Sequence, residues 1–286
     1  MITTREGTVR DLQALAQRIF SPASLCHVGD LAWQRFQHAG REAEWTTRVW
    51  ERDGVVLAWG WVDAHGLQLL VDPAFPYLAG AVLDEFPGHS VPVLDSEVHV
   101  IAALVERGYR AQEGPFSVYL AHPLTDLATP VLPDGFHARH VTPADLDRRV
   151  EVHRAAWHPS RVTAASYAAL SAAWPYQATL DWVIEAPDGT FAASCLIWLD
   201  PVHRVAELEP VGTAPTHRRK GLARAVCLAA MRAARDAGAE RAIVYPVVGD
   251  PRSVGALPLY LGLGFTQYGR CTTYRGGTRS IGRSFA

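Results

Sequence analysis

Alternating apolar and polar positions predict two runs of β-strands, one in each half of the chain. Three strands are predicted in the first half, over residues 45–51, 55–63 and 67–71. Three more are predicted in the second half, over residues 179–185, 191–199 and 205–213. Turns containing glycine or proline separate the strands, so we expect each run to fold back on itself.

The first helix of each half is preceded by the same N-terminal cap. A threonine is followed three residues later by an aspartate, a pattern typical of helix starts. A basic residue precedes the cap at the same offset in both halves, giving Arg5, Thr8 and Asp11 first and then Arg139, Thr142 and Asp145. Both halves also close with a glycine and an aromatic residue before a last strand, at Gly108–Tyr109 before residues 116–121 and at Gly264–Phe265 before residues 272–275.

This repetition favours an internal duplication of about 140 residues over a single large sheet. We predict a first domain over residues 1–122 and a second over residues 135–286. Residues 123–134 between them are rich in proline and turn formers, which is typical of a linker.

The stretch at residues 205–224 carries the chemistry. Glu207 and Glu209 lie on one face of its strand, because strand side chains alternate with period two. A basic turn with Gly221 follows and opens a long helix that ends at Gly238, and a mostly apolar strand is expected after it over residues 241–248. Helix N-termini have free N–H groups and the positive end of the dipole, and a glycine allows close approach. The turn is therefore expected to bind an anion such as phosphate.

The motif Arg218-x-x-Gly221-x-Ala223 resembles the acetyl-CoA signature of the GNAT superfamily of N-acetyltransferases. A second match lies downstream, where Ala256, Tyr260, Gly264 and Phe265 keep the spacing of the family pattern. Two departures are Ser253, where the family usually has asparagine, and Pro258 within the same segment.

The resemblance implies an α+β fold of two tandem GNAT-like domains. Each would be a mostly antiparallel, mixed sheet flanked by helices, with splayed fourth and fifth strands and acyl-CoA in the opening. The first half would be a degenerate copy, because Pro76 and Ala79 stand where the second half has Arg218 and Gly221. Its expected role is structural, as a cover for the other half's sheet and a wall of the acceptor cleft. A function of its own is the alternative.

The resemblance also implies acetyl-CoA as the acyl donor, with no metal. The expected cofactor contacts are Val211, Gly212 and Thr213 for the pantetheine arm, Arg218, Arg219, Lys220, Gly221, Leu222 and Ala223 for the pyrophosphate, and Ser253 and Ala256.

Amide formation needs a base for the amine proton and an acid for the departing thiolate. Glu207 or Glu209 is the candidate base and Tyr260 the candidate acid. The alternatives are a carboxylate pair balancing Arg204 or Arg224 on a solvated face, and a tyrosine that only packs on the sheet. Three alternatives stay open. One is a non-catalytic acyl-CoA-binding or sensing module, and another is a scaffold whose pocket is empty. The third is an acetyltransferase for an amino-sugar conjugate, similar in plan to mycothiol synthase.

The acceptor is expected to be a small-molecule amine. The segments 157–161 and 174–176 hold three aromatic residues that suit either a flat substrate or, as we favour, a packed helical hairpin. His158 has no partner at metal-ligand spacing.

The net charge of −2 gives no reason to expect nucleic acid or membrane as a partner. No apolar run suggests a membrane span or signal peptide, and four dispersed cysteines indicate buried thiols in a reducing cytoplasm. The single lysine suggests a GC-rich bacterial genome, and we expect a monomer or homodimer.

Overall fold

A computed structural model describes residues 1–21 and 24–276 and has an α+β fold. The first half contains β1 (Thr3–Glu6), α1 (Val9–Arg18), α2 (Val28–Phe36), η1 (Glu42–Glu44), β2 (Thr46–Arg52), β3 (Val55–Asp63), β4 (Gly66–Val71), α3 (Leu78–Glu85), β5 (Val91–Leu94), α4 (Val98–Glu106), β6 (Tyr109–Ala111) and β7 (Phe116–His122). The three strands predicted from alternation in this half are therefore confirmed to within one residue, whereas the strand predicted from residue 179 in the second half begins two residues later, at Asp181.

The second half repeats this order. It contains β8 (His137–His140), η2 (Pro143–Asp145), α5 (Leu146–Ala156), α6 (Ala164–Ser171), η3 (Ala178–Leu180), β9 (Asp181–Glu185), β10 (Phe191–Asp200), β11 (Val205–Thr213), η4 (Pro215–His217), α7 (Leu222–Asp236), β12 (Arg241–Val244), β13 (Val247–Val248), α8 (Ala256–Leu263) and β14 (Thr266–Gly276). Two expectations were wrong. The strand expected at residues 241–248 is interrupted at Tyr245–Pro246, where proline has no N–H for a sheet ladder. The last strand is longer than residues 272–275, because it begins directly after Phe265.

The same ion-pair network anchors the first strand and helix of each half. Arg5 binds Asp11 at 2.7 Å and Glu51 at 2.9 Å, and Arg139 binds Asp145 and Glu185, each at 2.7 Å. In both halves the aspartate also accepts the threonine backbone N–H of the predicted cap, at 2.8 Å. Equivalent residues thus make equivalent contacts, as expected of a duplication.

The two halves exchange strands. One sheet has the order β1-β2-β3-β4, and the other has the order β5-β14-β7-β12-β11-β10-β9-β8 with β6 and β13 at its side. β7 comes from the first half but lies between β12 and β14 of the second. β14 in turn pairs with β5 and β6 of the first half. The repetition in the sequence gave no sign of this exchange.

The splayed fourth and fifth strands of the second half are confirmed. β11 and β12 are parallel and pair only from Val205 opposite Arg241 to Glu207 opposite Ile243. Beyond Glu207, β11 continues to Thr213 without β12 beside it. An opening therefore forms next to the second half of β11.

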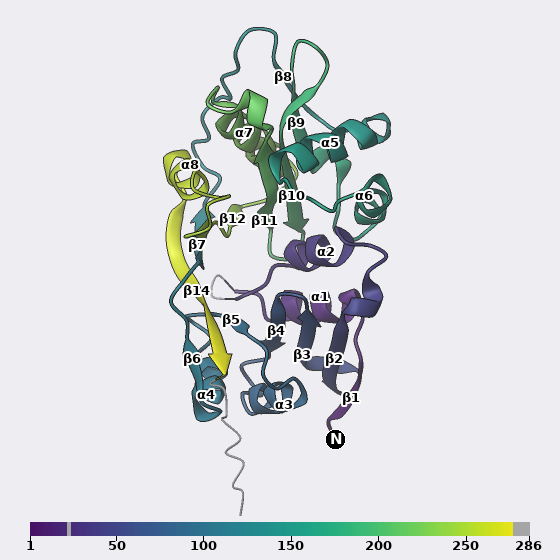
Figure 1. Cartoon of the computed structure of the whole chain (residues 1–286), viewed down its shortest axis with the longest axis vertical. Coiled ribbons are helices and arrows are strands. Elements are labelled where there is room, and N and C mark those ends of the chain that lie inside the picture. Colours follow the sequence, from purple (N-terminus) through teal and green to yellow (C-terminus); the bar gives the residue numbers. More distant parts are fainter. Residues whose placement is uncertain (22–23, 277–286) are drawn as a thin grey trace, which may run out of the picture.

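Two helices pack against β10 and β11, the strands beside this opening. α7 packs against β10 and β11 through a buried apolar face that includes Val226, Ala230 and Met231. Burying such side chains contributes about 1.5–3 kcal/mol each for the larger ones. α2 from the first half lies against β10, and Figure 1 shows it in the middle of the molecule, between the β1–β4 sheet and the second half. A Cβ on Gly29 of α2 would be 2.1 Å from the Trp198 Cβ, so only glycine permits this approach.

Candidate active site

A cavity of about 380 Å³ lies beside β11, where β12 diverges from it. The second half contributes predicted site residues to its lining, namely Glu207, Glu209, Val211, Ser253, Ala256 and Tyr260. The first half contributes Leu25, Cys26, Asp30, Gln34 and Tyr119. All three catalytic candidates thus share one cavity with three of the eleven predicted cofactor contacts, and α2 and β7 from the first half wall it.

Glu207 forms a buried hydrogen bond with the first half of the chain. Its side chain is 1% exposed, and its Oε2 is 3.0 Å from His27 Nδ1. The Gly29 N–H also donates to that nitrogen, at 3.1 Å. Nδ1 therefore acts as an acceptor, and the proton in its contact with Glu207 belongs to the carboxyl group.

The pKa values agree with a neutral pair. Burial raises the pKa of Glu207 to about 8, although the Asp30 backbone N–H partly opposes this. Burial lowers the pKa of His27 to about 4. Near pH 7, Glu207 is therefore a carboxylic acid and His27 an uncharged imidazole.

Glu209 has a different environment. Its side chain is half-buried, lines the cavity and makes no hydrogen bond to another residue within 1–21 and 24–276. Burial, and then the charges of Glu207 and Asp30, raise its pKa well above the ordinary value. Its backbone carbonyl accepts the Trp198 Nε1–H at 2.7 Å, which fixes the strand at this point. Glu209 is therefore the carboxyl group that is free to exchange a proton with a ligand.

Tyr260 projects from α8 into the same cavity. Its ring contacts Phe265 edge-on, with 5.7 Å between the ring centroids. Its hydroxyl makes no hydrogen bond to any other residue that the structure describes. Burial raises the pKa of Tyr260 well above 10, so the hydroxyl stays protonated and can donate.

The basic turn precedes α7 and has the backbone geometry of an anion site. Arg219 and Gly221 have φ values of +65° and +77°. Gly221 is the N-cap of α7 and has no side chain with which to cap the first N–H groups. A Cβ at Gly221 would meet no atom within 4 Å, so the backbone is open to a ligand. Lys220 and Gly221 line a second hollow of about 420 Å³, together with linker residues 129 and 131–133.

Comparisons with known proteins give the family of the second half. Residues 148–265 match the acetyltransferase (GNAT) family. The second half of the chain contains a GNAT acetyltransferase domain. A comparison with curated proteins found no match.

Solved structures extend the likeness in fold to the whole chain. A GCN5-related N-acetyltransferase from Sphaerobacter thermophilus is 16% identical, with a TM-score of 0.64 and coverage of 96% of this chain and 95% of that one. A GNAT acetyltransferase from Colwellia psychrerythraea is also 16% identical, with a TM-score of 0.65 and coverage of 97% and 100%. A tandem GNAT protein from the clavulanic acid biosynthesis pathway is 14% identical, with a TM-score of 0.59 and coverage of 96% and 98%.

Several predicted cofactor contacts lie outside the lining of this cavity. Gly212 lies close to α5, where a Cβ would be 2.7 Å from the Ala156 Cβ. Thr213 pairs with Ala193 in β10. Ser253 Oγ donates to the Val247 carbonyl at 2.8 Å, so it fixes its own loop. Of the turn residues, Leu222 is buried, Ala223 is half-buried and Arg218 is exposed.

Glu207 and Glu209 do not pair with Arg204 or Arg224, as one alternative supposed. Arg204 binds Glu240, and Arg224 donates to the Gly262 carbonyl at 2.6 Å. The two aromatic segments considered for the acceptor, residues 157–161 and 174–176, have different environments. Trp157 lines the cavity, whereas the Tyr176 hydroxyl donates to Asp181 at 3.2 Å in the packed helical hairpin.

Sequence reasoning missed the residues that the first half contributes. Asp30 lines the cavity, and its Oδ1 accepts the Gln34 side-chain N–H at 2.7 Å. Burial, with a contribution from Glu207, raises its pKa to about 7. Tyr119 stacks on Tyr245 with 4.0 Å between ring centroids. No motif distinguishes these side chains from ordinary helix and strand residues.

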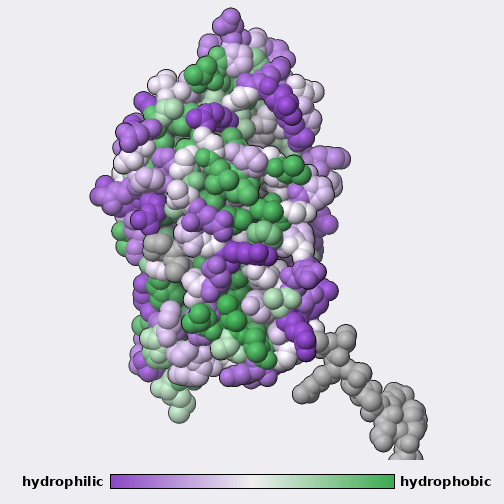
Figure 2. Space-filling model, turned by 90° about the vertical axis from the view of Figure 1, so that its left-hand side faces the viewer, coloured by the Kyte–Doolittle hydropathy of each residue, from purple (hydrophilic) through white to green (hydrophobic). Residues whose placement is uncertain are grey.

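The outer side of the cleft is partly apolar. Val247, Val254 and Leu261, from β13, the following loop and α8, are exposed. Figure 2 views the side that carries α8, β7 and β14 and shows apolar surface along its middle.

Within the described ranges, no group of three potential metal ligands is clustered, and no helix is both long and apolar enough to cross a membrane. The four cysteines are buried and free.

Proposed function

We propose that the GNAT domain transfers an acetyl group from acetyl-CoA to a primary amine, with Glu209 as general base and Tyr260 as general acid. One observation carries this proposal: an unpaired carboxyl group and an unpaired hydroxyl line the same cavity at the splay of β11 and β12. Base and acid must both reach the reacting atoms, and this cavity supplies both.

The reaction would occur in one attack. The amine nitrogen forms a bond to the thioester carbonyl carbon, and Glu209 accepts the proton that the nitrogen loses, directly or through water. The carbon–sulfur bond breaks, and Tyr260 donates its proton to the departing thiolate. Backbone N–H groups of β11 beyond Glu207, where β12 no longer pairs, would stabilise the carbonyl oxygen.

Acetyl-CoA would lie along β11 towards the N-terminus of α7. Val211, Gly212 and Thr213 would hold its pantetheine arm, and the turn from Arg218 to Ala223 its pyrophosphate, through N–H groups and the helix dipole. Arg219 and Lys220 would add modest attraction at the surface.

Asp30 and Glu209 suit an acceptor that arrives as an ammonium ion. An anionic carboxyl group attracts the protonated amine, and a base with a raised pKa can then remove a proton near neutrality. This supports a small-molecule amine rather than a purely apolar acceptor. The placement of Glu209 and Tyr260 in one cavity weighs against a module that only binds acyl-CoA.

The test is CoA release from acetyl-CoA in the presence of a panel of primary amines, followed as free thiol. For any amine that is turned over, Glu209→Gln is expected to lower kcat by about 10²–10⁴-fold, the usual contribution of a general base. Glu207→Gln is the matched control, because its amide N–H can still donate to His27 Nδ1, and its effect should be at most about tenfold. Equal activity of Glu209→Gln and wild type, or no turnover of any amine, would contradict the proposal.

A further inference from the structure

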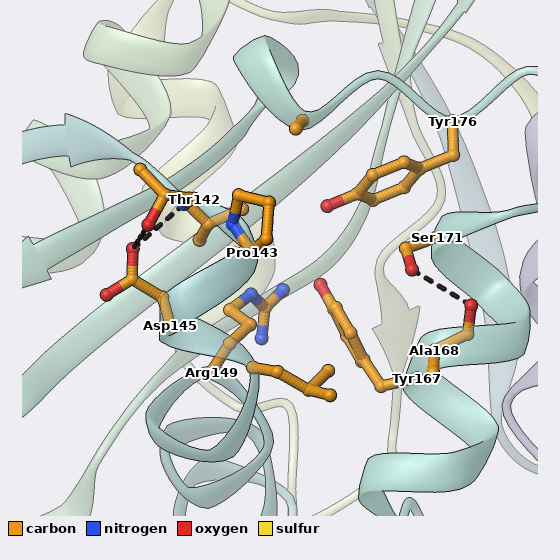
Figure 3. Close-up of a pocket in the computed structure, with 11 residues that line it drawn as sticks. Thr142, Pro143, Asp145, Arg149, Tyr167, Ala168, Ser171 and Tyr176 are labelled. Carbon is orange, nitrogen blue, oxygen red and sulfur yellow. Dashed lines mark hydrogen bonds between the residues drawn. The ribbon is translucent and has the colours of Figure 1, made fainter.

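Another cavity, distinct from the hollow beside Gly221, lies between α5, α6 and η3. It shares no lining residue with the candidate active site. Its volume is about 340 Å³. Figure 3 shows the Arg149 guanidinium projecting into it from α5, facing the ring of Pro143 and the hydroxyl ends of Tyr167 and Tyr176. Arg149 is 0% exposed, so this is a buried cation at the base of a hollow.

The guanidinium uses only part of its hydrogen-bonding capacity. Nε donates to Asp181 Oδ1 at 2.8 Å. Nη1 and Nη2 have no hydrogen-bond partner anywhere in the described part of the chain. Buried donors without partners are costly, so these N–H groups call for an acceptor that enters the cavity.

Asp181 holds Arg149 in this position but does not saturate it. Its other oxygen, Oδ2, accepts hydrogen bonds from the Tyr167 and Tyr176 hydroxyls. His153 on the same helix is uncharged, because burial and then the Arg149 charge lower its pKa to about 3. The arginine is thus fixed by one bond at Nε, with its two terminal nitrogens directed at the space in front.

The remaining charge at the cavity is already compensated. Asp145 lines the edge, but it pairs with Arg139 at 2.7 Å and also with Arg148. An incoming anion would therefore meet a guanidinium with two unpaired nitrogens rather than an unpaired carboxylate. Two neighbouring N–H groups in a rigid plane match the two oxygens of a carboxylate.

The rest of the lining is largely apolar, from Val141, Pro143, Leu146, Ala168 and Ala178 together with the tyrosine rings. We propose that this cavity binds a small organic acid, with its carboxylate on Nη1 and Nη2 of Arg149 and an apolar or aromatic body against these walls. The site is separate from the acetyl-transfer cleft and does not depend on the function proposed for it.

The test is calorimetric titration of the full chain with benzoate and hexanoate, and with benzamide as the uncharged counterpart of benzoate. We expect saturable binding of at least one acid at one site per chain, and benzamide binding weaker by at least about tenfold. Absence of saturable binding by both acids means that the cavity holds only water, and it overturns the proposal. Equal binding of benzoate and benzamide overturns the assigned role of Arg149.

Variants locate the site. Ala168→Phe, which places a ring at the cavity, should weaken acid binding by at least about tenfold without disturbing the Arg149–Asp181 pair. Ala165→Phe, at an exposed position of the same helix that does not line the cavity, should leave it within about twofold. Arg149→Lys keeps the charge but loses the fork, and should weaken binding to a similar extent if circular dichroism shows it folded. Unchanged binding in Ala168→Phe would place the acid elsewhere and overturn the proposal.

Discussion

The hydrogen bond between Glu207 and His27 joins side chains that are 180 residues apart in the sequence. It explains why the two glutamates of β11 differ, since one is held by a neighbour and the other is free. The sequence predicted both glutamates and Tyr260, because strand alternation and motif spacing are local properties. It could not choose between Glu207 and Glu209, and it could not reveal Asp30, because those depend on how the halves pack.

The pKa of Glu207 leads to a pH dependence of stability. The folded-state pKa of about 8 lies above the ordinary value of 4.5, so the folded protein holds an extra proton between these values. This contribution is fully present below about pH 4.5 and is lost as the pH rises through about 8. Asp30 and Glu97, with raised pKa values of about 7 and 8, act in the same direction.

We therefore expect the melting temperature to fall between pH 6 and pH 9, and to fall less steeply in Glu207→Gln, which has no proton to lose. Thermal unfolding monitored by circular dichroism across this range is the measurement. Parallel curves for wild type and variant would show that Glu207 does not titrate in this window.

Among the elements, α7 allows a matched pair of substitutions, because a glycine with left-handed backbone conformation flanks it at each end. Gly221 precedes it with φ +77°, Gly238 follows it with φ +102°, and a Cβ at either position would meet no atom within 4 Å. Alanine at either site should cost a similar amount of folding free energy, about 1 kcal/mol. Only Gly221→Ala should also weaken acetyl-CoA binding, by about tenfold or more, because only that end faces the proposed pyrophosphate site.

Thermal unfolding and acetyl-CoA titration of both variants separate these effects. Equal affinity of Gly221→Ala and Gly238→Ala for acetyl-CoA would remove the turn from the cofactor site.

The positions of most elements were predictable, since alternation, caps and glycine turns act within a few residues. The break at Pro246 is predictable from the missing N–H of proline, whereas the full extent of β14 depends on pairing with β5 and β7.

For the whole molecule, the exchange of strands makes the halves dependent on each other. β7 lies between β12 and β14, so a fragment of residues 135–286 would leave both strands without their neighbour. Val118 and Leu120 of β7 belong to the apolar core of the second half, so the fragment would also expose the side chains that pack against them. We expect this fragment to be insoluble or unfolded by circular dichroism, and to recover structure when residues 1–134 are co-expressed. A fragment that folds alone and binds acetyl-CoA would contradict a structural role for the exchange.

The duplication was predictable from repeated caps and closing motifs, but its domain boundaries at residues 122 and 135 remain a prediction. Repetition shows that two units descend from one plan, and it says nothing of which strands they share. The first half keeps the plan while its counterpart of Gly221, Ala79, lies buried inside α3. That difference implies a single acetyl-CoA site per chain.

Calorimetric titration of acetyl-CoA into the full chain tests the central claim most directly. We predict saturable binding with one acetyl-CoA per chain, lost in Gly221→Asp because a carboxylate would then occupy the proposed pyrophosphate position. Circular dichroism would establish that the variant is folded. No binding to the wild type, a stoichiometry of two, or unchanged binding in Gly221→Asp would contradict an acetyltransferase site at the α7 turn.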